Sequence, residues 1–219
     1  NISDGRLIQH QVIKNGLESV ITVGNALIDM YANYGSLDEG KRVFDTLPVR
    51  DEVSWGAMLD GCAKNNDGFL ALELFEKMQK EGMSLDAVTF TCGLKACGSV
   101  GAAEKGKELH LEILRKGLLK RDLILGTALV DMYAKCGMLR RAQDVFNNLP
   151  YRDIVLWNSL ISGYAQVGEI ESVLGTFEEM RVEGIAPDRV TLLCCLKACG
   201  SIGAKHKGQE IHAEIDKQG

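Results

Sequence analysis

The sequence repeats itself at a distance of 102 residues. Residues 21–117 align with residues 123–219 without a gap, and 44 of the 97 aligned pairs are identical. Self-similarity at a fixed spacing is typical of repeat proteins, in which each unit buries its apolar face only against its neighbours. We therefore predict one continuous solenoid over residues 1–219. The units are a partial long unit (1–20), then a short, a middle and a long unit at 21–51, 52–86 and 87–122. A second short and middle unit follow at 123–153 and 154–188, and a partial long unit at 189–219.

Each unit has the apolar spacing of two amphipathic helices, and no segment alternates like a strand. In the unit 154–188 the two apolar sets are Trp157, Leu160, Ile161 and Tyr164, then Val173, Leu174, Phe177 and Met180. Glycine recurs where the first helix of a unit would end, at Gly35, Gly101, Gly137, Gly168 and Gly203. Residues 36–39, Ser-Leu-Asp-Glu, match the capping box of a second helix. We predict an all-α fold, a right-handed α-solenoid of stacked helix-turn-helix repeats.

The composition limits the classes of partner. The chain has 25 Lys and Arg against 30 Asp and Glu, a net charge of −5. This balance argues against unspecific adhesion to nucleic acid or to an anionic membrane, but it allows a local basic stripe. No run approaches the roughly 18 apolar residues of a membrane helix. Seven cysteines, six of them within helical patterns, indicate small buried residues in a reducing compartment. The chain begins with Asn1 and has no leader pattern, so we expect an excised segment without its targeting signal.

The units share a signature at their ends. Every complete unit ends in Asp, and the middle units carry Met-x-x-x-Gly shortly before it, as in VLWNSLISGYAQVGEIESVLGTFEEMRVEGIAPD. This pattern resembles the pentatricopeptide repeat (PPR). The cycle of short, middle and long units resembles the S, P and L repeats of the plant PLS class over essentially the whole chain. The resemblance implies single-stranded RNA binding in the mitochondrion or chloroplast, as the recognition part of a C-to-U RNA editing factor. It also implies a small organellar editing cofactor protein as a second partner. The sequence has no Gly-rich phosphate loop, Ser/His/Asp set or metal-ligand cluster, so we expect no enzymatic activity, cofactor or metal in these residues.

A solenoid with a fixed step per unit can present one pair of side chains to each nucleotide of an unpaired strand. The resemblance places these base-reading residues at the fifth and last positions of each unit. It implies that Asn with Asp favours U, that Thr with Asp favours G, that Gly56 discriminates poorly and that a long unit reads unreliably. Leu193, in the last unit, cannot hydrogen-bond a base. With the N-terminus toward the RNA 5′ end, the implied footprint is 5′-U-N-(G)-G-U-3′. The pairs are Asn25 with Asp51, Gly56 with Asp86, Thr91 with Asp122, Thr127 with Asp153, and Asn158 with Asp188.

Two further sets of residues are candidates for RNA contact. The resemblance places the second residue of each unit between successive bases, where an aliphatic side chain packs on a base face without preferring any base. Lys64 and Lys135 occupy matching places further along first helices, equivalent to Asn33 and Gln166, and are candidates for phosphate contact. The base-packing residues are Thr22, Val53, Val88, Ile124, Val155 and Val190.

Structural explanations compete with these assignments. Asn25 and Asn158 would merely cap helices, and the terminal Asp residues would N-cap the next unit. Both lysines would simply be solvated. Trp55 and Trp157 could be stacking platforms for bases, but each lies in an apolar helical stripe, which favours core packing.

An enzymatic explanation is weaker. His-x-Glu occurs at His110 and His212, as in zinc deaminases, but the Pro-Cys-x-x-Cys partner is absent. A structural histidine repeated in both copies explains the pattern, whereas a hydrolase or deaminase would require bound zinc. The main alternative function is a helical-repeat scaffold for a protein or peptide, although tetratricopeptide repeats keep about 34 residues per unit. The two end faces of the solenoid favour end-to-end self-association.

Overall fold

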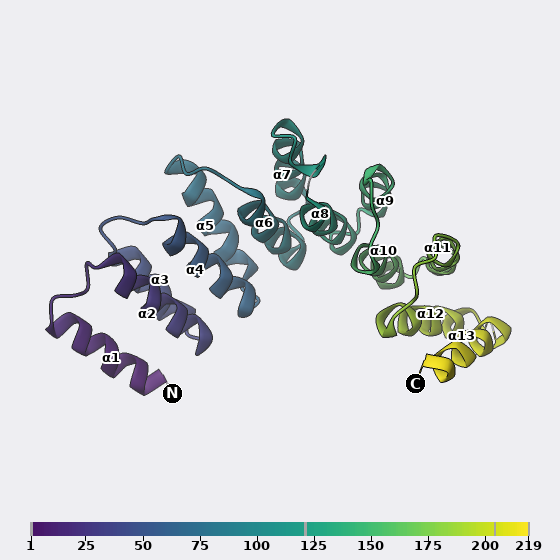
Figure 1. The fold of residues 1–219 in the computed structure, drawn as a ribbon, viewed down its shortest axis with the longest axis horizontal. Coiled ribbons are helices and arrows are strands. Elements are labelled where there is room, and N and C mark those ends of the chain that lie inside the picture. The colour runs from purple at the N-terminus through teal and green to yellow at the C-terminus, as the bar shows by residue number, and fades with distance from the viewer. Residues whose placement is uncertain (1, 121, 204, 219) are drawn as a thin grey trace. The chain divides into compact units, whose positions relative to one another are not determined.

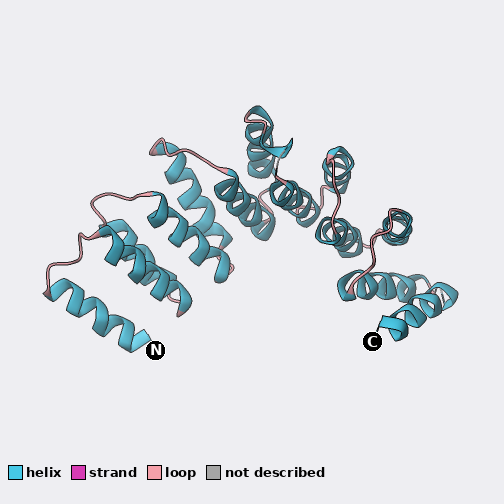
Figure 2. Cartoon of the chain, in the orientation of Figure 1, coloured by secondary structure: helices cyan, strands magenta, loops and turns pink. Residues whose placement is uncertain are grey.

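The computed structural model describes residues 2–120, 122–203 and 205–218. These residues form thirteen α-helices and one 3₁₀ turn, with no strand among them (Figures 1 and 2). The all-α prediction is therefore confirmed. The chain divides into two compact bodies, which we call the N-terminal body (Asn1–Val100) and the C-terminal body (Gly101–Gly219). The expectation of a single solenoid stays a prediction, and each body is described by itself.

In the N-terminal body the first helices of consecutive units form a row. Helix α2 packs on α4 and α4 packs on α6, while α3 lies against α2 and α4, and α5 against α4 and α6. Each second helix thus fills the space between its own first helix and the next one, which produces two layers. The helices are α1 (Ile2–Lys14), α2 (Ile21–Asn33), α3 (Leu37–Thr46), α4 (Glu52–Lys64), α5 (Gly68–Lys80) and α6 (Ala87–Val100).

The C-terminal body repeats this arrangement. Helices α8, α10 and α12 form the row of first helices, and α9 and α11 pack between successive members of the row (Figure 1). Helix α7 and the 3₁₀ turn η1 (Leu118–Lys120) pack on α8. No helix in the described part of the chain is long and apolar enough to cross a bilayer. The helices are α7 (Ala103–Arg115), α8 (Leu123–Lys135), α9 (Leu139–Asn148), α10 (Ile154–Val167), α11 (Ile170–Val182), α12 (Arg189–Ile202) and α13 (Lys205–Gln218).

Most of the predicted core residues are buried, while Tyr164 and Leu174 are half-buried. Trp55 is 0% exposed and Trp157 is 1% exposed. Their rings meet Phe44 and Phe146 edge-on, with centroids 4.7 Å and 4.6 Å apart. These contacts join a second helix to the first helix of the next unit, so the tryptophans are packing residues and the stacking-platform alternative is wrong. All seven cysteines, which lie within the described residues, are present as thiols.

Local sequence sets most helix ends. The five predicted glycines have positive φ values between 66° and 80°, a conformation that a side chain disfavours. In the first middle unit Asn66 takes this role with φ 55°, as asparagine tolerates this region best among residues with a side chain.

The predicted capping box at residues 36–39 is wrong. Ser36 precedes α3, but its side chain makes no cap hydrogen bond, and its ψ is 62°, outside the extended region that an N-cap adopts. The Ser36 N–H, which Glu39 would accept in a capping box, donates to Tyr31 O at 2.9 Å. Glu39 accepts instead from Arg6 at 2.6 Å.

The short units have fewer residues than the middle units because their second helices are shorter. Helices α3 and α9 have 10 residues, whereas α5 and α11 have 13. An arginine donates hydrogen bonds to carbonyls at the C-terminal end of each of these short helices, α3 and α9. Arg50 donates to Phe44 O at 3.0 Å and to Asp45 O at 3.1 Å, lies 5.0 Å from the Phe44 ring centroid and pairs with Glu81 at 3.7 Å. Arg152 repeats this set of contacts 102 residues later. The guanidinium therefore binds carbonyls that a helix end leaves unpaired.

Adjacent first helices approach closely at a repeated glycine. A Cβ on Gly163 would lie 2.5 Å from the Cβ of Ala134, and one on Gly61 would lie 2.8 Å from the Cβ of Ala32. Both are contacts between small groups that cannot rotate away. The row of first helices therefore depends on glycine at this position.

We predict that Gly163→Ala lowers the free energy of unfolding by about 1–3 kcal/mol, because the added methyl group overpacks the contact between α8 and α10. Gly175→Ala is the matched control, since a Cβ there meets nothing within 4 Å. In the control the better helix propensity of alanine should raise stability by about 0.5–1 kcal/mol. Urea unfolding followed by circular dichroism measures both, and equal effects would contradict the packing argument.

Candidate nucleic-acid interface

The predicted base-reading residues lie where one unit joins the next. The fifth residue of each unit is in the first turns of the first helix, and the last residue directly precedes the first helix of the following unit. First helices of consecutive units are neighbours within each body. Two side chains distant in sequence can therefore meet at the unit boundaries within each body.

Both predicted Asn–Asp pairs are in contact. Asn158 Nδ2 donates to Asp188 Oδ2 at 3.0 Å in the C-terminal body. Asn25 Nδ2 donates to Asp51 Oδ1 at 3.4 Å in the N-terminal body. Neither asparagine caps its own helix, because the N-cap residues of α2 and α10 are Val20 and Asp153. The capping explanation for the two asparagines is therefore wrong.

The capping explanation for the terminal aspartates is confirmed, however. Each of them accepts a hydrogen bond from a backbone N–H in the first turn of the next first helix, at 2.8–3.0 Å. A carboxylate has two oxygens and can serve a cap and a neighbouring side chain together. Capping and base reading are thus compatible roles. The five residues are Asp51, Asp86, Asp122, Asp153 and Asp188.

The threonine and glycine positions differ from the asparagine positions. Thr127 donates its hydroxyl proton to Leu123 O at 2.9 Å, and Thr91 donates to Ala87 O at 2.8 Å. The proton of each hydroxyl is therefore used within its own helix, and oxygen lone pairs remain as acceptors. Gly56 is exposed, and a Cβ there would meet nothing within 4 Å. The first middle unit thus has space at the reading position but no side chain.

The second residues of the units reverse the usual pattern of exposure. The aliphatic side chains Val53, Val88 and Ile124 are 63%, 70% and 72% exposed, whereas the nearby polar residues Asn25 and Thr91 are each 8% exposed. Val155 and Val190 are also exposed, as is Thr22. Folding alone favours the opposite distribution, so these positions stay candidates for a binding surface. Leu193 is exposed and has no hydrogen-bonding side chain.

Two of the predicted base-reading aspartates, Asp51 and Asp188, are held as carboxylates. Backbone and hydroxyl hydrogen bonds from Ser54 lower the pKa of Asp51. Burial alone would raise the pKa of Asp188, but hydrogen bonds from the backbone and hydroxyl of Thr191 and from Asn158 outweigh it, so this pKa is also lowered. A carboxylate accepts hydrogen bonds with both oxygens, which suits it to orient an amide.

The two predicted phosphate-binding lysines are paired with neighbouring carboxylates. Lys64 Nζ lies 2.8 Å from Asp60 Oδ2, and Lys135 Nζ lies 2.7 Å from Asp131 Oδ2. Both lysines are exposed. Phosphate contact by Lys64 and Lys135 stays a prediction, and in each case it would compete with an ion pair along the same helix.

The histidine of the first His-x-Glu motif is structural. His110 Nδ1 lies 2.9 Å from the Tyr133 hydroxyl, and the two rings meet edge-on. Burial and the nearby Arg141 lower the pKa of His110. Tyr31 makes the equivalent bond to Gln9 at 2.7 Å in the N-terminal body. Among the described residues no group of three His, Cys, Asp or Glu side chains could hold a metal ion.

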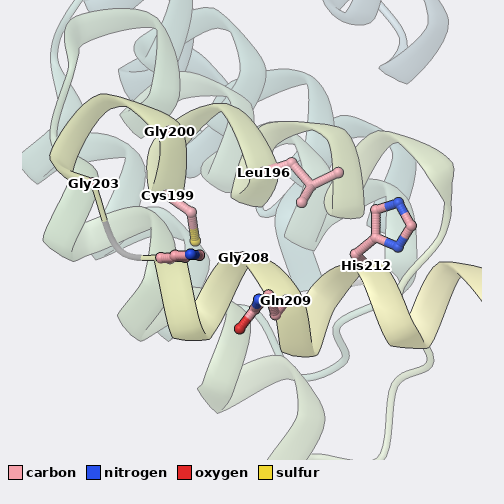
Figure 3. Close-up of a pocket in the computed structure, with 8 residues that line it drawn as sticks. Leu196, Cys199, Gly200, Gly203, Gly208, Gln209 and His212 are labelled. Carbon is pink, nitrogen blue, oxygen red and sulfur yellow. The ribbon is translucent and has the colours of Figure 1, made fainter.

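Two hollows lie away from the reading positions. One of about 580 Å³ is lined by α7, η1 and α9, with Leu114 and Val145 among its residues. A shallower one of about 360 Å³ lies between α12 and α13, where Leu196, Cys199 and His212 line it (Figure 3). Neither includes a predicted base-reading or base-packing residue. In each body the candidate interface therefore consists of side chains on first helices, outside these two hollows.

Sequence reasoning missed the third residue of the units. Ser54, Thr89 and Thr191 are buried, and each hydroxyl lies 2.7–3.1 Å from the aspartate that precedes its helix. The signal was present in the sequence, because Asp-x-x-Ser/Thr is a helix-capping pattern. Its consequence for the reader pairs required coordinates.

The fold and the interface define a helical-repeat protein with a capping aspartate at five unit boundaries, two of which also pair with an asparagine of the preceding first helix. The model of the PPR repeat family matches residues 50–99 and 152–201, and that of the PPR repeat matches residues 25–50 and 127–154. Together these matches cover more than half of the chain. The chain belongs to the pentatricopeptide repeat family.

Relatives in Arabidopsis thaliana align with nearly the whole chain. Pentatricopeptide repeat-containing protein At1g06140, mitochondrial, is 34% identical over 218 residues, which are 100% of this chain and 39% of that protein. Pentatricopeptide repeat-containing protein At2g03880, mitochondrial, is 38% identical over 207 residues, 94% of this chain and 32% of that protein. The chain thus spans less than two fifths of the length of these relatives.

Solved structures share the fold. The crystal structure of the pentatricopeptide repeat protein PPR10 in complex with an 18-nt psaJ RNA element superposes with a TM-score of 0.84 at 22% identity, covering 99% of this chain and 33% of that chain. The structure of PPR10 from maize gives a TM-score of 0.80 at 23% identity, covering 99% and 31%. These likenesses confirm the α-solenoid prediction.

We predict that Asp188→Asn destabilises the protein at pH 7 and that this difference shrinks as the pH falls below about 4. The pKa of Asp188 is lowered in the folded state, so its carboxylate stabilises the fold above the unfolded-state pKa of about 3.9. That stabilisation is lost as the pH falls through the folded-state pKa. Urea unfolding at pH 7 and pH 3 measures it. Asp144→Asn, at an exposed position of α9, is the control, and a pH-independent Asp188→Asn effect would contradict the prediction.

Proposed function

We propose that this chain binds single-stranded RNA and reads it with one repeat unit per nucleotide. The observation that carries the proposal is the pairing of a sheltered amide with a capping carboxylate, beside exposed aliphatic side chains, at the unit boundaries. An amide held by a carboxylate presents a fixed donor and acceptor to a base edge, while the aliphatic neighbours pack on base faces. The RNA bound to PPR10 supports the same class of ligand for this fold.

The units follow the S, P and L cycle of the PLS class in this proposal. Support comes from the second helices, because α3 and α9 are three residues shorter than α5 and α11 and end at an arginine-closed linker. The proposed role of these residues is recognition, within a C-to-U editing factor, and not catalysis. A small editing cofactor protein and end-to-end self-association remain expectations from the sequence.

An organellar location completes the proposal. Two of the relatives carry "mitochondrial" in their names, so the mitochondrion is the compartment with support and the chloroplast is the alternative. Binding should depend only moderately on salt, because each neutralised phosphate contributes a slope of about −0.7 for single strands and Lys64 and Lys135 are already paired with carboxylates.

A mobility-shift assay separates RNA binding from a scaffold function. The probes are a single strand that carries U and G at the assigned positions and the same sequence as a duplex. Retention of the single strand alone supports the proposal. Binding to neither would contradict it and favour a helical-repeat scaffold for a protein or peptide.

We predict that Thr127→Asn changes the preferred base of its unit from G towards U, because the new amide can pair with Asp153 as Asn158 pairs with Asp188. Selection from a randomised RNA pool measures the preference at each position. Gly175→Ala, on α11 and remote from the reading positions, is the control and should leave the profile unchanged. An unaltered profile for Thr127→Asn would refute the assignment of this residue.

A further inference from the structure

One reader pair has a third member, which comes from the following unit. Thr191 is 0% exposed, and its hydroxyl oxygen lies 2.6 Å from Asn158 Oδ1 and 3.1 Å from Asp188 Oδ1. The same oxygen accepts the Asp188 N–H at 3.2 Å. Thr191 thus touches both residues of the pair while it completes the cap of α12.

The hydroxyl has a single proton to donate. Asp188 Oδ1 already accepts from the backbone N–H groups of Val190 and Thr191, at 2.8 Å and 3.0 Å. Asn158 Oδ1 is the closer acceptor, so the proton is directed to it. The amide of Asn158 is therefore held at both ends, with its nitrogen bonded to Asp188 and its oxygen bonded to Thr191.

The other asparagine reader is held at one end only. Ser54 occupies the equivalent third position, and its hydroxyl donates to Asp51 Oδ1 at 2.8 Å. It does not reach Asn25, whose Oδ1 is buried without a hydrogen-bond partner. The bond from Asn25 Nδ2 to Asp51 is also longer, at 3.4 Å. In the two units that follow Asp122 and Asp153 the third residue is leucine, Leu125 and Leu156, which offers no hydroxyl.

We propose that Thr191 is a positioning residue that sets the base specificity of Asn158 and Asp188, so that this reader has three members. The proposal rests on the proposed function. The held amide has one N–H and one oxygen lone pair left for a ligand, in a fixed order. Uracil and cytosine present opposite donor and acceptor orders on their pairing edges, so rotation of the amide by half a turn would exchange one preference for the other. Thr191 opposes that rotation, and the ligand class it selects is uracil over cytosine.

The test compares two RNAs that differ only in U or C at the base assigned to Asn158. Thr191→Val should reduce the U-over-C affinity ratio about 2- to 10-fold, the equivalent of one net hydrogen bond. Thr191→Ser should keep the ratio, because it keeps the hydroxyl. Thr191→Ala is measured in parallel, in case valine prevents folding, and should behave as valine does. The ratio at the base assigned to Asn25 should not change in any of these variants.

Thr89→Val is the matched control for the loss of a cap. Thr89 bonds Asp86 through its N–H and hydroxyl, at 2.8 Å and 2.7 Å, but the reader of that unit is Gly56 and has no amide to hold. The control should lower stability without altering the ratio at the base assigned to Asn158. If wild type prefers U there and the valine and alanine variants keep the full ratio, the inference is overturned and the proposed function stands. If wild type binds no single-stranded RNA, both are overturned.

Discussion

The carboxylate at each unit boundary connects the local structure of the repeat to its proposed function. It accepts backbone N–H groups at the start of the next first helix, and in two units it also accepts the amide of an asparagine from the preceding first helix. The first contact terminates one unit and begins the next. The second contact gives the reading side chain a defined orientation. A change that weakens the cap therefore also disturbs the polar group beside it, which links stability to the proposed recognition through one side chain.

The rest of the architecture serves to place these boundaries at regular intervals. Edge-on contacts of Trp55 and Trp157 join second helices to the next first helices. Close approach at Gly61 and Gly163 brings first helices side by side. With the apolar faces buried in this way, the exposed aliphatic second residues have no packing role that would explain them. Their position beside the sheltered polar residues suits the proposed packing on the faces of bases.

Much of the fold could be predicted from the sequence because it depends on short-range rules repeated in every unit. Apolar periodicity, glycine at helix ends and terminal aspartates specify helices, turns and caps without information from distant residues. The capping box at Ser36 failed because the Ser36 N–H, which Glu39 would accept in such a box, donates to Tyr31 O, and Glu39 accepts from Arg6. The hydrogen bonds from Arg50 to the last carbonyls of α3 could not be predicted from the sequence either. They depend on the residue at which the helix ends and on the carbonyls that this end leaves unpaired.

The candidate site was predictable in position but not in detail. The fifth and last residues were expected to meet, and two pairs do, yet the sequence could not show that Thr127 uses its proton on its own helix or that Lys64 and Lys135 are paired with carboxylates. The difference between Asn25 and Asn158 depends on whether a serine or a threonine hydroxyl reaches the amide oxygen. The presence or absence of such a bond follows from side-chain packing, which sequence patterns do not specify.

The central claim is that bases meet the N-terminal turns of the first helices. The most direct test is photo-crosslinking of an RNA that carries 4-thiouridine at the base assigned to Asn158, followed by mass spectrometry of the crosslinked peptides. The account predicts crosslinks within the first turns of α10 and α12, around Val155, Asn158 and Val190. Crosslinks that fall instead on the second helices α9 or α11 would contradict it.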